Sequence, residues 1–400
     1  MSTSATAGDD EGRFQVFGSL CLMVFMVNFG RIVWAPLLDP FMRTFGVGEA
    51  TVGLVASLAW LGSAAPRLPT GYLLMYLDRH HVVMGTGVVL SASAAFTATV
   101  DSILLIGVGA FAMGATSGAY FIAGNPLVSE LFPDRVGRVI GIHGTASQIA
   151  AVVAPLSIGL VLAFSTWRAV FWAVSVVSLA ATVLLSVTAR GATMPDVQSG
   201  DRHLRESVLN QWPIVVTGIA IMGATGFVWN GLFNFYVSYL TATKDVAIGT
   251  AQTLLTGVFA AGVPAFWYSG KLADRVEYGT LLLGILGAFV IAVLALTVVQ
   301  GFYAIVAVSL VMGFVIHSLF PALDTFLLDG LPDSDRASAY AAYSATIMLV
   351  QAGASLAVGW LVQRGIGYDR VFRSFGLVLI AILVILAALE RSNRLPTATN

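Results

Sequence analysis

The chain has 400 residues, of which 58% are hydrophobic and only 10% are charged. Soluble proteins carry about 25% charged residues, so this composition excludes a string of soluble domains and indicates a membrane protein. Twenty Lys and Arg against 21 Asp and Glu leave a net charge of −1, which offers no basic surface to nucleic acid. The expected partner of such a chain is the lipid bilayer.

Long uncharged intervals predict where the chain crosses the membrane. A helix needs about 20 mainly apolar residues to cross ~30 Å of hydrocarbon, and charged residues mark the ends of such segments. Residues 1–13 are polar and acidic and lack the features of a signal peptide. We predict an all-α membrane protein whose twelve transmembrane helices lie at 14–38, 49–75, 82–100, 103–128, 138–163, 168–190, 212–240, 249–271, 279–299, 302–328, 337–362 and 368–390.

The distribution of cations predicts the orientation. With a cytoplasmic N-terminus, twelve of the 20 Lys and Arg lie on the cytoplasmic side, six lie outside, and Arg31 and Arg67 lie within helices. The positive-inside rule then predicts a multi-pass plasma-membrane protein with both termini in the cytoplasm. The expected parts are a cytoplasmic tail (1–13), a six-helix half (14–190), a cytoplasmic linker (191–211), a second six-helix half (212–390) and a second tail (391–400).

An offset of 199 residues relates the two halves. It aligns Gly85 with Gly284, Met113-Gly114 with Met312-Gly313, and Pro133-Asp134 with Pro332-Asp333. Six spans per copy is an even number, so both copies enter the membrane from the same side. Parallel repeats of this kind, forming two pseudo-symmetric halves, are typical of secondary transporters, so a small-molecule or ion substrate is an expected partner.

The loop after the eighth span, Gly270-Lys271-Leu272-Ala273-Asp274-Arg275, resembles the Gly-x-Leu-Ala-Asp-Arg loop of the major facilitator superfamily. The resemblance covers the whole chain and implies the major facilitator fold, alternating access and a gating role for Gly270, Asp274 and Arg275. The repeat copy begins at Gly71 but has Met75 where Asp is expected, with Asp78, Arg79 and the pair His80-His81 downstream. That first loop is a gate or simply a solvated connection.

Two arginines inside the predicted spans are the strongest candidate substrate ligands. A charge at the centre of a membrane helix costs about 2.5–3.5 kcal/mol, so Arg31 and Arg67 need a partner. No acidic residue shares their depth in the first half, while Asn28 and Trp34 share the helix face of Arg31. A guanidinium binds carboxylate, phosphate or nitrate through a planar fork. An anionic substrate is therefore expected, and backbone carbonyls, water, snorkelling or a structural contact are the alternatives.

Two partial resemblances also favour an anion. Gly30-Arg31 is similar to the span-one arginine of anion:cation symporters, and Arg67-Leu68-Pro69 is similar to a segment of nitrate/nitrite porters. The second arginine of those porters has no counterpart here, because the repeat equivalent of Arg67 is Phe266. The implied cargo is an organic carboxylate, a phosphate ester or a nitrate-like ion, carried by symport.

Polar residues elsewhere in the spans are further candidates. His317 and Asp324 lie seven residues apart on one helix face and could carry a proton. Asn230 and Asn234 also share a face. The further candidate substrate ligands are Tyr120, Gln148, Asn230, Asn234, Gln252 and Tyr343.

Other functions remain as alternatives. Proton-coupled efflux of lipophilic, drug-like compounds is one, and a non-transporting membrane sensor is another. The sequence contains no phosphate-binding loop and no His-Glu-x-x-His motif, so we expect neither an enzyme nor a cofactor. Cys21 is the single cysteine, and we expect no metal site. A monomer is expected.

Overall fold

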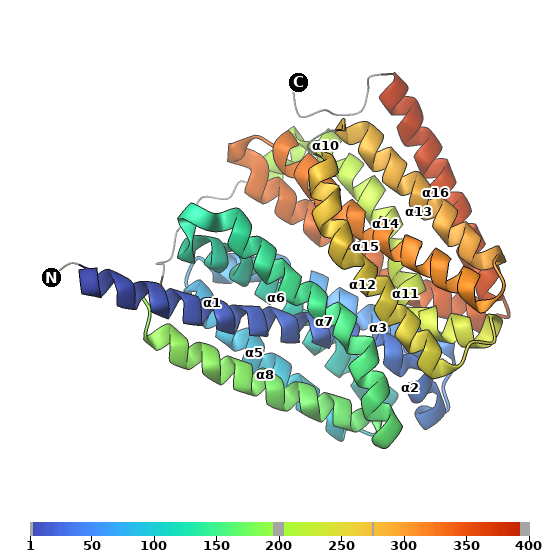
Figure 1. Cartoon of the computed structure of the whole chain (residues 1–400), viewed down its shortest axis with the longest axis horizontal. Helices are drawn as coiled ribbons and strands as arrows, with labels where there is room; N and C mark the ends of the chain where they lie inside the picture. Colours follow the sequence, from blue (N-terminus) through green and yellow to red (C-terminus); the bar gives the residue numbers. More distant parts are fainter. Residues whose placement is uncertain (1–2, 195–203, 274–275, 393–400) are drawn as a thin grey trace. The chain divides into compact units, whose positions relative to one another are not determined.

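The computed structural model describes residues 3–194, 204–273 and 276–392, which form helices joined by short connections (Figure 1). This part of the chain contains no β-strand, in agreement with the predicted all-α fold. It divides into two compact units. The first comprises Met1–Leu37 and Leu58–Gly200, and the second comprises Leu38–Ser57 and Asp201–Asn400.

The first unit is built on helices that pack along one another. Its elements are α1 (Thr3–Ile32), η1 (Ala35–Leu37), the end of α3 (Glu49–Ala64), α4 (Arg67–Leu73), α5 (Arg79–Thr99), α6 (Ile103–Leu131), η2 (Pro133–Arg135), α7 (Val136–Phe164) and α8 (Trp167–Arg190). Helix α1 packs on α7 and α8, and α5 packs on α6 and α8, so that α1, α5 and α8 lie side by side in Figure 1.

The second unit follows the same plan. Its elements are α2 (Leu38–Phe45), the start of α3, α9 (Leu204–Asn210), α10 (Trp212–Gly218), the π-helical turn η3 (Ile219–Gly223), α11 (Ala224–Thr243), α12 (Ile248–Ala273), α13 (Tyr278–Val298), α14 (Phe302–Gly330), α15 (Asp333–Gln363) and α16 (Tyr368–Arg391). Helix α12 packs on α14, α11 on α15, and α13 on α14 and α16.

The helix limits confirm most of the predicted spans. Helices α8, α13, α14 and α16 begin and end within two residues of the predicted limits. Eleven segments of the described chain are long and apolar enough to cross a membrane. The predicted span without a counterpart among them is 49–75.

Two predicted spans are interrupted helices. The span 49–75 is divided into α3 and α4 by a turn at Ala65 and Pro66. The span 14–38 is divided into α1, η1 and α2 by a turn before Pro36. Proline lacks the N–H that would continue the helix, and it disfavours helical geometry in the residue before it. The expectation of one unbroken helix in each span was therefore wrong.

The segments outside the spans are partly helical. Helix α1 begins at Thr3, so the predicted tail 1–13 is largely helical; no proline separates it from the first span. The predicted linker 191–211 ends in helix α9, and its residues 195–203 lie outside the described part of the chain. Of the predicted tail 391–400, only residues 391–392 are described. The proposed domain limits stay a prediction.

Close helix packing sets the position of α3 against α6 in the first unit. A Cβ atom on Gly114 would collide with the backbone oxygen of Ala59, and one on Gly118 would collide with that of Ser63. The two glycines lie one turn apart on α6, an arrangement that lets membrane helices approach to backbone contact. The end of α3 is thereby held beside α6.

Candidate functional site: an arginine beside an aromatic pair

Arg31 lies at the interruption of the first span, in the last turn of α1. Its Nη2 donates a hydrogen bond to Oδ1 of Asn28 at 2.6 Å. Asn28 is itself buried and donates from Nδ2 to the backbone oxygen of Ser147 in α7 at 2.7 Å. Asn28 and Arg31, which the helical period places on one face, are thus hydrogen-bonded to each other. Asn28 holds the guanidinium and ties it to a second helix.

Two aromatic rings flank the guanidinium. The Cζ atom of Arg31 lies 5.0 Å from the ring centre of Trp60 on α3 and 5.8 Å from that of Phe121 on α6. Both distances fall in the range of cation–π attraction. Sequence reasoning missed both rings as site residues, since an aromatic residue in an apolar helix gives no sign of which neighbour it faces. The backbone contact of α3 with α6 brings them together.

Arg31 keeps unused hydrogen-bonding capacity. Its Nε is buried and has no hydrogen-bond partner. Among the described residues of the first unit, Arg31 forms no ion pair with a carboxylate. A buried donor without a partner costs about 1–3 kcal/mol, and more when the group is charged. The Nε of this guanidinium is therefore a donor that the described residues leave without an acceptor.

Arg67 adds a second positive charge. It is buried at the start of α4, directly after the turn at Pro66. Its Nε donates to the backbone oxygen of Ser63 at 3.2 Å, so a backbone carbonyl provides part of its coordination, as the alternative reading of the sequence anticipated. The charges of Arg67 and Arg31 are close enough to repel each other. The charge of Arg67 therefore adds to the positive electrostatic potential around Arg31, which favours an anion.

The other predicted ligands of the first unit have structural contacts. Trp34 is buried, donates to the backbone oxygen of Gly30 at 3.1 Å and packs against Phe171 with ring centres 5.2 Å apart. The hydroxyl of the buried Tyr120 donates to the backbone oxygen of Leu20 at 2.8 Å and lies 2.9 Å from Nε2 of His143. Gln148 is half-buried on α7. Their roles as substrate ligands stay predictions.

The second unit has a polar cluster without charge. Asn234 donates from Nδ2 to Oδ1 of Asn230 at 2.8 Å, and the Oγ of Ser355 donates to the same oxygen at 3.3 Å. The Nδ2 of Asn230 is buried without a partner. The predicted pair on one face of α11 is therefore bonded and retains one free donor. Gln252 on α12 and Tyr343 on α15 are also buried.

His317 and Asp324 both lie on α14 but form hydrogen bonds to different partners. The Nδ1 of His317 donates to the backbone oxygen of Gly313 at 2.7 Å, and its ring packs against Trp229 and Phe259. Asp324 accepts a hydrogen bond from the hydroxyl of Tyr340 at 2.9 Å. These contacts resemble those of a packed structural histidine, and the proton-carrying pair stays a prediction.

The first of the two predicted gating loops ends at an ion pair that joins the start of α5 to α6. Arg79, the first residue of α5, donates from Nε to both carboxylate oxygens of Glu130 at 2.8 and 2.9 Å. Gly71 lies in α4, and Asp78 directly precedes α5. In the second loop, Gly270 belongs to α12, whereas Asp274 and Arg275 lie outside the described residues. The gating role stays a prediction for both loops.

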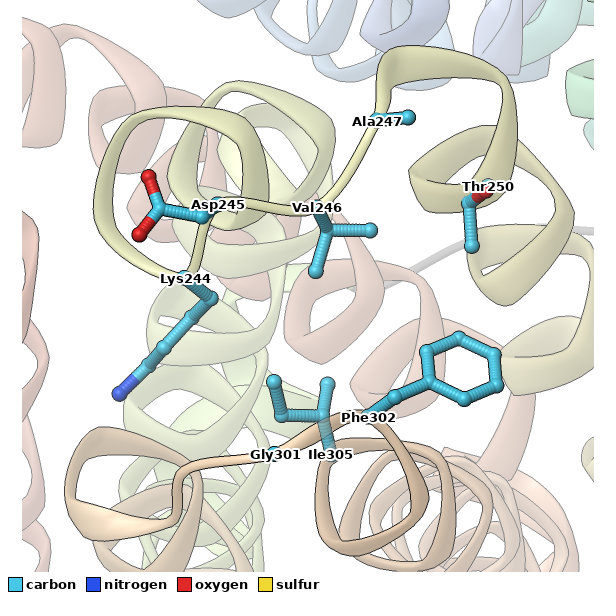
Figure 2. A pocket seen from close by; sticks show the side chains of 8 residues that line it. All are labelled: Lys244, Asp245, Val246, Ala247, Thr250, Gly301, Phe302 and Ile305. Carbon is cyan, nitrogen blue, oxygen red and sulfur yellow. The ribbon is translucent and has the colours of Figure 1, made fainter.

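A pocket of about 390 Å³ lies where α11 meets α12 and α14 begins (Figure 2). Figure 2 shows Lys244 extending away from the ring of Phe302. Lys244 is buried and donates to the backbone oxygens of Thr297 and Val299 at 3.3 and 3.2 Å. None of the predicted site residues lines this pocket, so it is not the candidate anion site.

Comparisons with known proteins place the chain among transporters. The family model described as Major Facilitator Superfamily matches residues 20–348 and 219–399. The probable sulfoacetate transporter SauU of Cupriavidus necator is 22% identical over 407 residues, covering 92% of this chain and 91% of that protein. The uncharacterized protein Mb2288 of Mycobacterium bovis is 24% identical over 409 residues, covering 95% of this chain and 92% of that protein.

A solved structure shares the fold. A bacterial homolog of the human lysosomal transporter Spinster, in an inward-facing and unoccupied conformation, superposes with a TM-score of 0.75 at 15% identity. The superposition covers 94% of this chain and 96% of that one. Together with the apolar helices, the family match confirms a multi-pass membrane protein. The chain belongs to the major facilitator superfamily, and it is a secondary transporter of that fold.

Proposed function

We propose that this transporter carries a small organic anion and that Arg31 is the principal ligand for it. The observation that carries the proposal is the buried Nε of Arg31, which has no hydrogen-bond partner, while Nη2 of the same guanidinium is held by Asn28. An anion that accepts this N–H would satisfy a buried donor and neutralise a charge in one contact. Charge-assisted hydrogen bonds of this kind are about twice as strong as neutral ones.

The surroundings of Arg31 favour a compact anion. Trp60 and Phe121 flank the guanidinium and limit the space around it, while the nearby charge of Arg67 suits a cargo with a second negative group. SauU is named for sulfoacetate, whose carboxylate and sulfonate groups both match planar guanidinium donors. Small carboxylates and sulfonates with two anionic groups are therefore the cargo class we favour over nitrate. We propose that the cargo crosses by alternating access.

A ligand screen by thermal unfolding tests the cargo class. A ligand that binds the folded state raises its stability in proportion to the logarithm of ligand concentration over Kd. Purified protein is heated with sulfoacetate, short dicarboxylates, phosphate esters, nitrate or lipophilic cations. We expect anions that carry two charged groups, such as sulfoacetate and short dicarboxylates, to raise the unfolding temperature in a concentration-dependent way. Stabilisation by lipophilic cations alone would instead support drug efflux.

A substitution then tests the ligand. Arg31→Ala should weaken binding of the stabilising anion by about 2 kcal/mol or more, roughly 30-fold, because it removes one partner of a buried charge pair. Uptake into proteoliposomes should fall accordingly. Arg364→Ala is the matched control, since this exposed arginine also stacks on a tryptophan, with its Cζ 3.7 Å from the ring centre of Trp360. Unchanged anion binding by a folded Arg31→Ala protein would refute the assignment.

A further inference from the structure

Three metal-ligating side chains meet in the connection between α4 and α5. They are Asp78, which directly precedes α5, and the pair His80 and His81 in its first turn. One ligand atom from each residue lies within 4.8 Å of the other two. This loop is also the one that departs from the pattern of the family, because Met75 stands where a carboxylate is expected.

The three side chains face one another. The Nδ1 of His81 lies 3.3 Å from Oδ2 of Asp78. The imidazole rings of His80 and His81 have centres only 3.9 Å apart, although neighbouring positions on a helix usually point about 100° away from each other. Both rings therefore stand on the same side of the helix start, next to the carboxylate.

Asp78 and His80 lack the hydrogen bonds that a purely structural role would give them. Asp78 occupies the position from which Asp usually accepts a hydrogen bond from the first turn of a helix, yet its side chain makes no such bond. The Nδ1 of His80 is buried without any hydrogen-bond partner. A carboxylate turned away from the helix and an unpartnered imidazole nitrogen both remain available to a further ligand.

Arg79 does not neutralise this group. Although it lies between Asp78 and His80 in the sequence, its guanidinium is engaged by the carboxylate of Glu130, with Nη2 and Oε1 2.8 Å apart. The charge of Asp78 is thus left for another cation. The ion pair of Arg79 with Glu130 also joins the start of α5 to α6, which fixes the helix end that carries the two histidines.

We propose that Asp78, His80 and His81 bind a divalent transition metal ion, for which Zn²⁺ is the probe of choice. Two imidazole nitrogens and one carboxylate oxygen form a ligand set that Zn²⁺ accepts, with metal–ligand distances of about 2.0–2.2 Å. Neighbouring ligands around such an ion lie roughly 3.3 Å apart by tetrahedral geometry. The pair of His81 and Asp78 already has that spacing, and His80 needs a shift within the range of a side-chain rotation.

The site is suited to an exchangeable ion. The side chains of His81 and Asp78 are 55% and 35% exposed, so an ion can reach them from solvent. Three protein ligands leave at least one coordination position for water, whereas structural zinc sites are closed by four. Binding would join the connection after α4 to the first turn of α5. The predicted orientation places this site in the cytoplasm.

Metal titration of protein freed from any polyhistidine tag tests the proposal. Chelator-treated protein is titrated with Zn²⁺ against a colorimetric zinc indicator. We expect one Zn²⁺ bound per chain in the wild type and the loss of that equivalent in His80→Asn and His81→Asn. Asp78→Asn should weaken binding because it removes the charged ligand. His203→Asn is the matched control, since it removes a histidine outside the triplet and should leave the stoichiometry unchanged.

Folding and ligation are checked separately. The unfolding temperature in chelator should be the same for the variants and the wild type, which shows that a lost equivalent reflects lost ligands. X-ray absorption of the zinc-loaded wild type should detect two imidazole ligands, and this measurement needs no variant. A wild type that binds no Zn²⁺, variants that retain the full equivalent, or a zinc shell without imidazole would each overturn the proposal. None of these readouts depends on the transported anion.

Discussion

Asn28 sets the charge that the proposed anion would meet at Arg31. It accepts from the guanidinium through Oδ1 and donates through Nδ2 to the backbone of α7, so it uses both ends of its amide within the protein. A neutral amide holds the guanidinium without cancelling its positive charge. A carboxylate at the same position would hold it equally well and cancel the charge.

This difference predicts the effects of two substitutions at Asn28. Asn28→Asp places a carboxylate beside Nη2 of Arg31, and the resulting internal ion pair should compete with the proposed anionic cargo. We expect Asn28→Asp to lose stabilisation by the anion and to lose uptake. Asn28→Ala, which also loses the bond to Ser147 but adds no charge, should retain part of both. Thermal unfolding with and without the anion measures the contrast. Equal anion binding in the two variants would show that the charge on Arg31 is not used.

The candidate site could be predicted from the sequence only in part. An arginine in an apolar span is visible as a sequence feature, and the helical period places Asn28 beside Arg31. The same period also placed Trp34 there, yet its indole bonds to Gly30 and packs in the core. Trp60 and Phe121 were missed because their position depends on the contact of α3 with α6. Local periodicity reports what shares a face, whereas tertiary packing decides what that face meets.

The spacing of charged residues predicted where helices lie but not where they are interrupted. Pro36 and Pro66 coincide with the interruptions of the first two spans. Pro126, Pro155, Pro264 and Pro321 lie inside helices that continue through them. Neighbouring helices and side chains can satisfy the backbone groups that a proline frees in a membrane helix. A proline alone therefore could not predict an interruption.

The contact of α12 with α14 explains the placement of His317. A Cβ atom on Gly262 would lie 2.5 Å from Cγ of His317, so the imidazole occupies the space left by the missing side chain. In the first half the equivalent positions are Ser63 and Gly118, where the glycine is on the other helix. In the second half the imidazole on α14 faces the glycine of α12, whereas in the first half Gly118 of α6 faces the backbone of Ser63 and the side chain of Pro66.

The fit of the His317 ring into the space beside Gly262 predicts that substitutions at these two positions have coupled effects on stability. Gly262→Ala should lower the unfolding temperature, because overpacking a fitted contact costs about 1–3 kcal/mol. His317→Ala removes the ring that the new methyl group meets. In that background Gly262→Ala should cost much less, and a double-mutant cycle should give a coupling energy of about 0.5–3 kcal/mol. Additive effects of the two substitutions would show that the ring does not occupy this space.

Positions related by the 199-residue repeat have similar packing contacts in the two halves, but their charges differ. Asp39 and Ser238 are equivalent positions and hydrogen-bond each other at 2.8 Å. Arg31 and Asn230 are also equivalent, yet one carries a charge and the other an amide whose Nδ2 has no partner. Helix packing has kept the symmetry of the duplication, while the residues proposed to bind cargo have diverged from it.

Equivalent glycines give the test of this symmetry. A Cβ atom on Gly114 would collide with the backbone oxygen of Ala59, and one on Gly313 with that of Val258, which is the equivalent contact in the second half. Gly85 and Gly284 are also equivalent, and a Cβ atom on either would meet nothing within 4 Å. These four glycines thus form one equivalent pair with crowded surroundings and one equivalent pair with open surroundings.

Four alanine substitutions should therefore fall into two matched classes. Gly114→Ala and Gly313→Ala should each lower the unfolding temperature, because a collision with backbone is relieved only by moving a helix, at about 1–3 kcal/mol. Gly85→Ala and Gly284→Ala should be neutral or stabilising by up to about 1 kcal/mol, since alanine favours a helix over glycine. Thermal unfolding of the four purified variants decides the matter. If alanine changed the unfolding temperature in opposite directions at the two members of a pair, the duplication would describe the sequence but not the packing of the two halves. Asn230 could then no longer be regarded as the structural counterpart of Arg31.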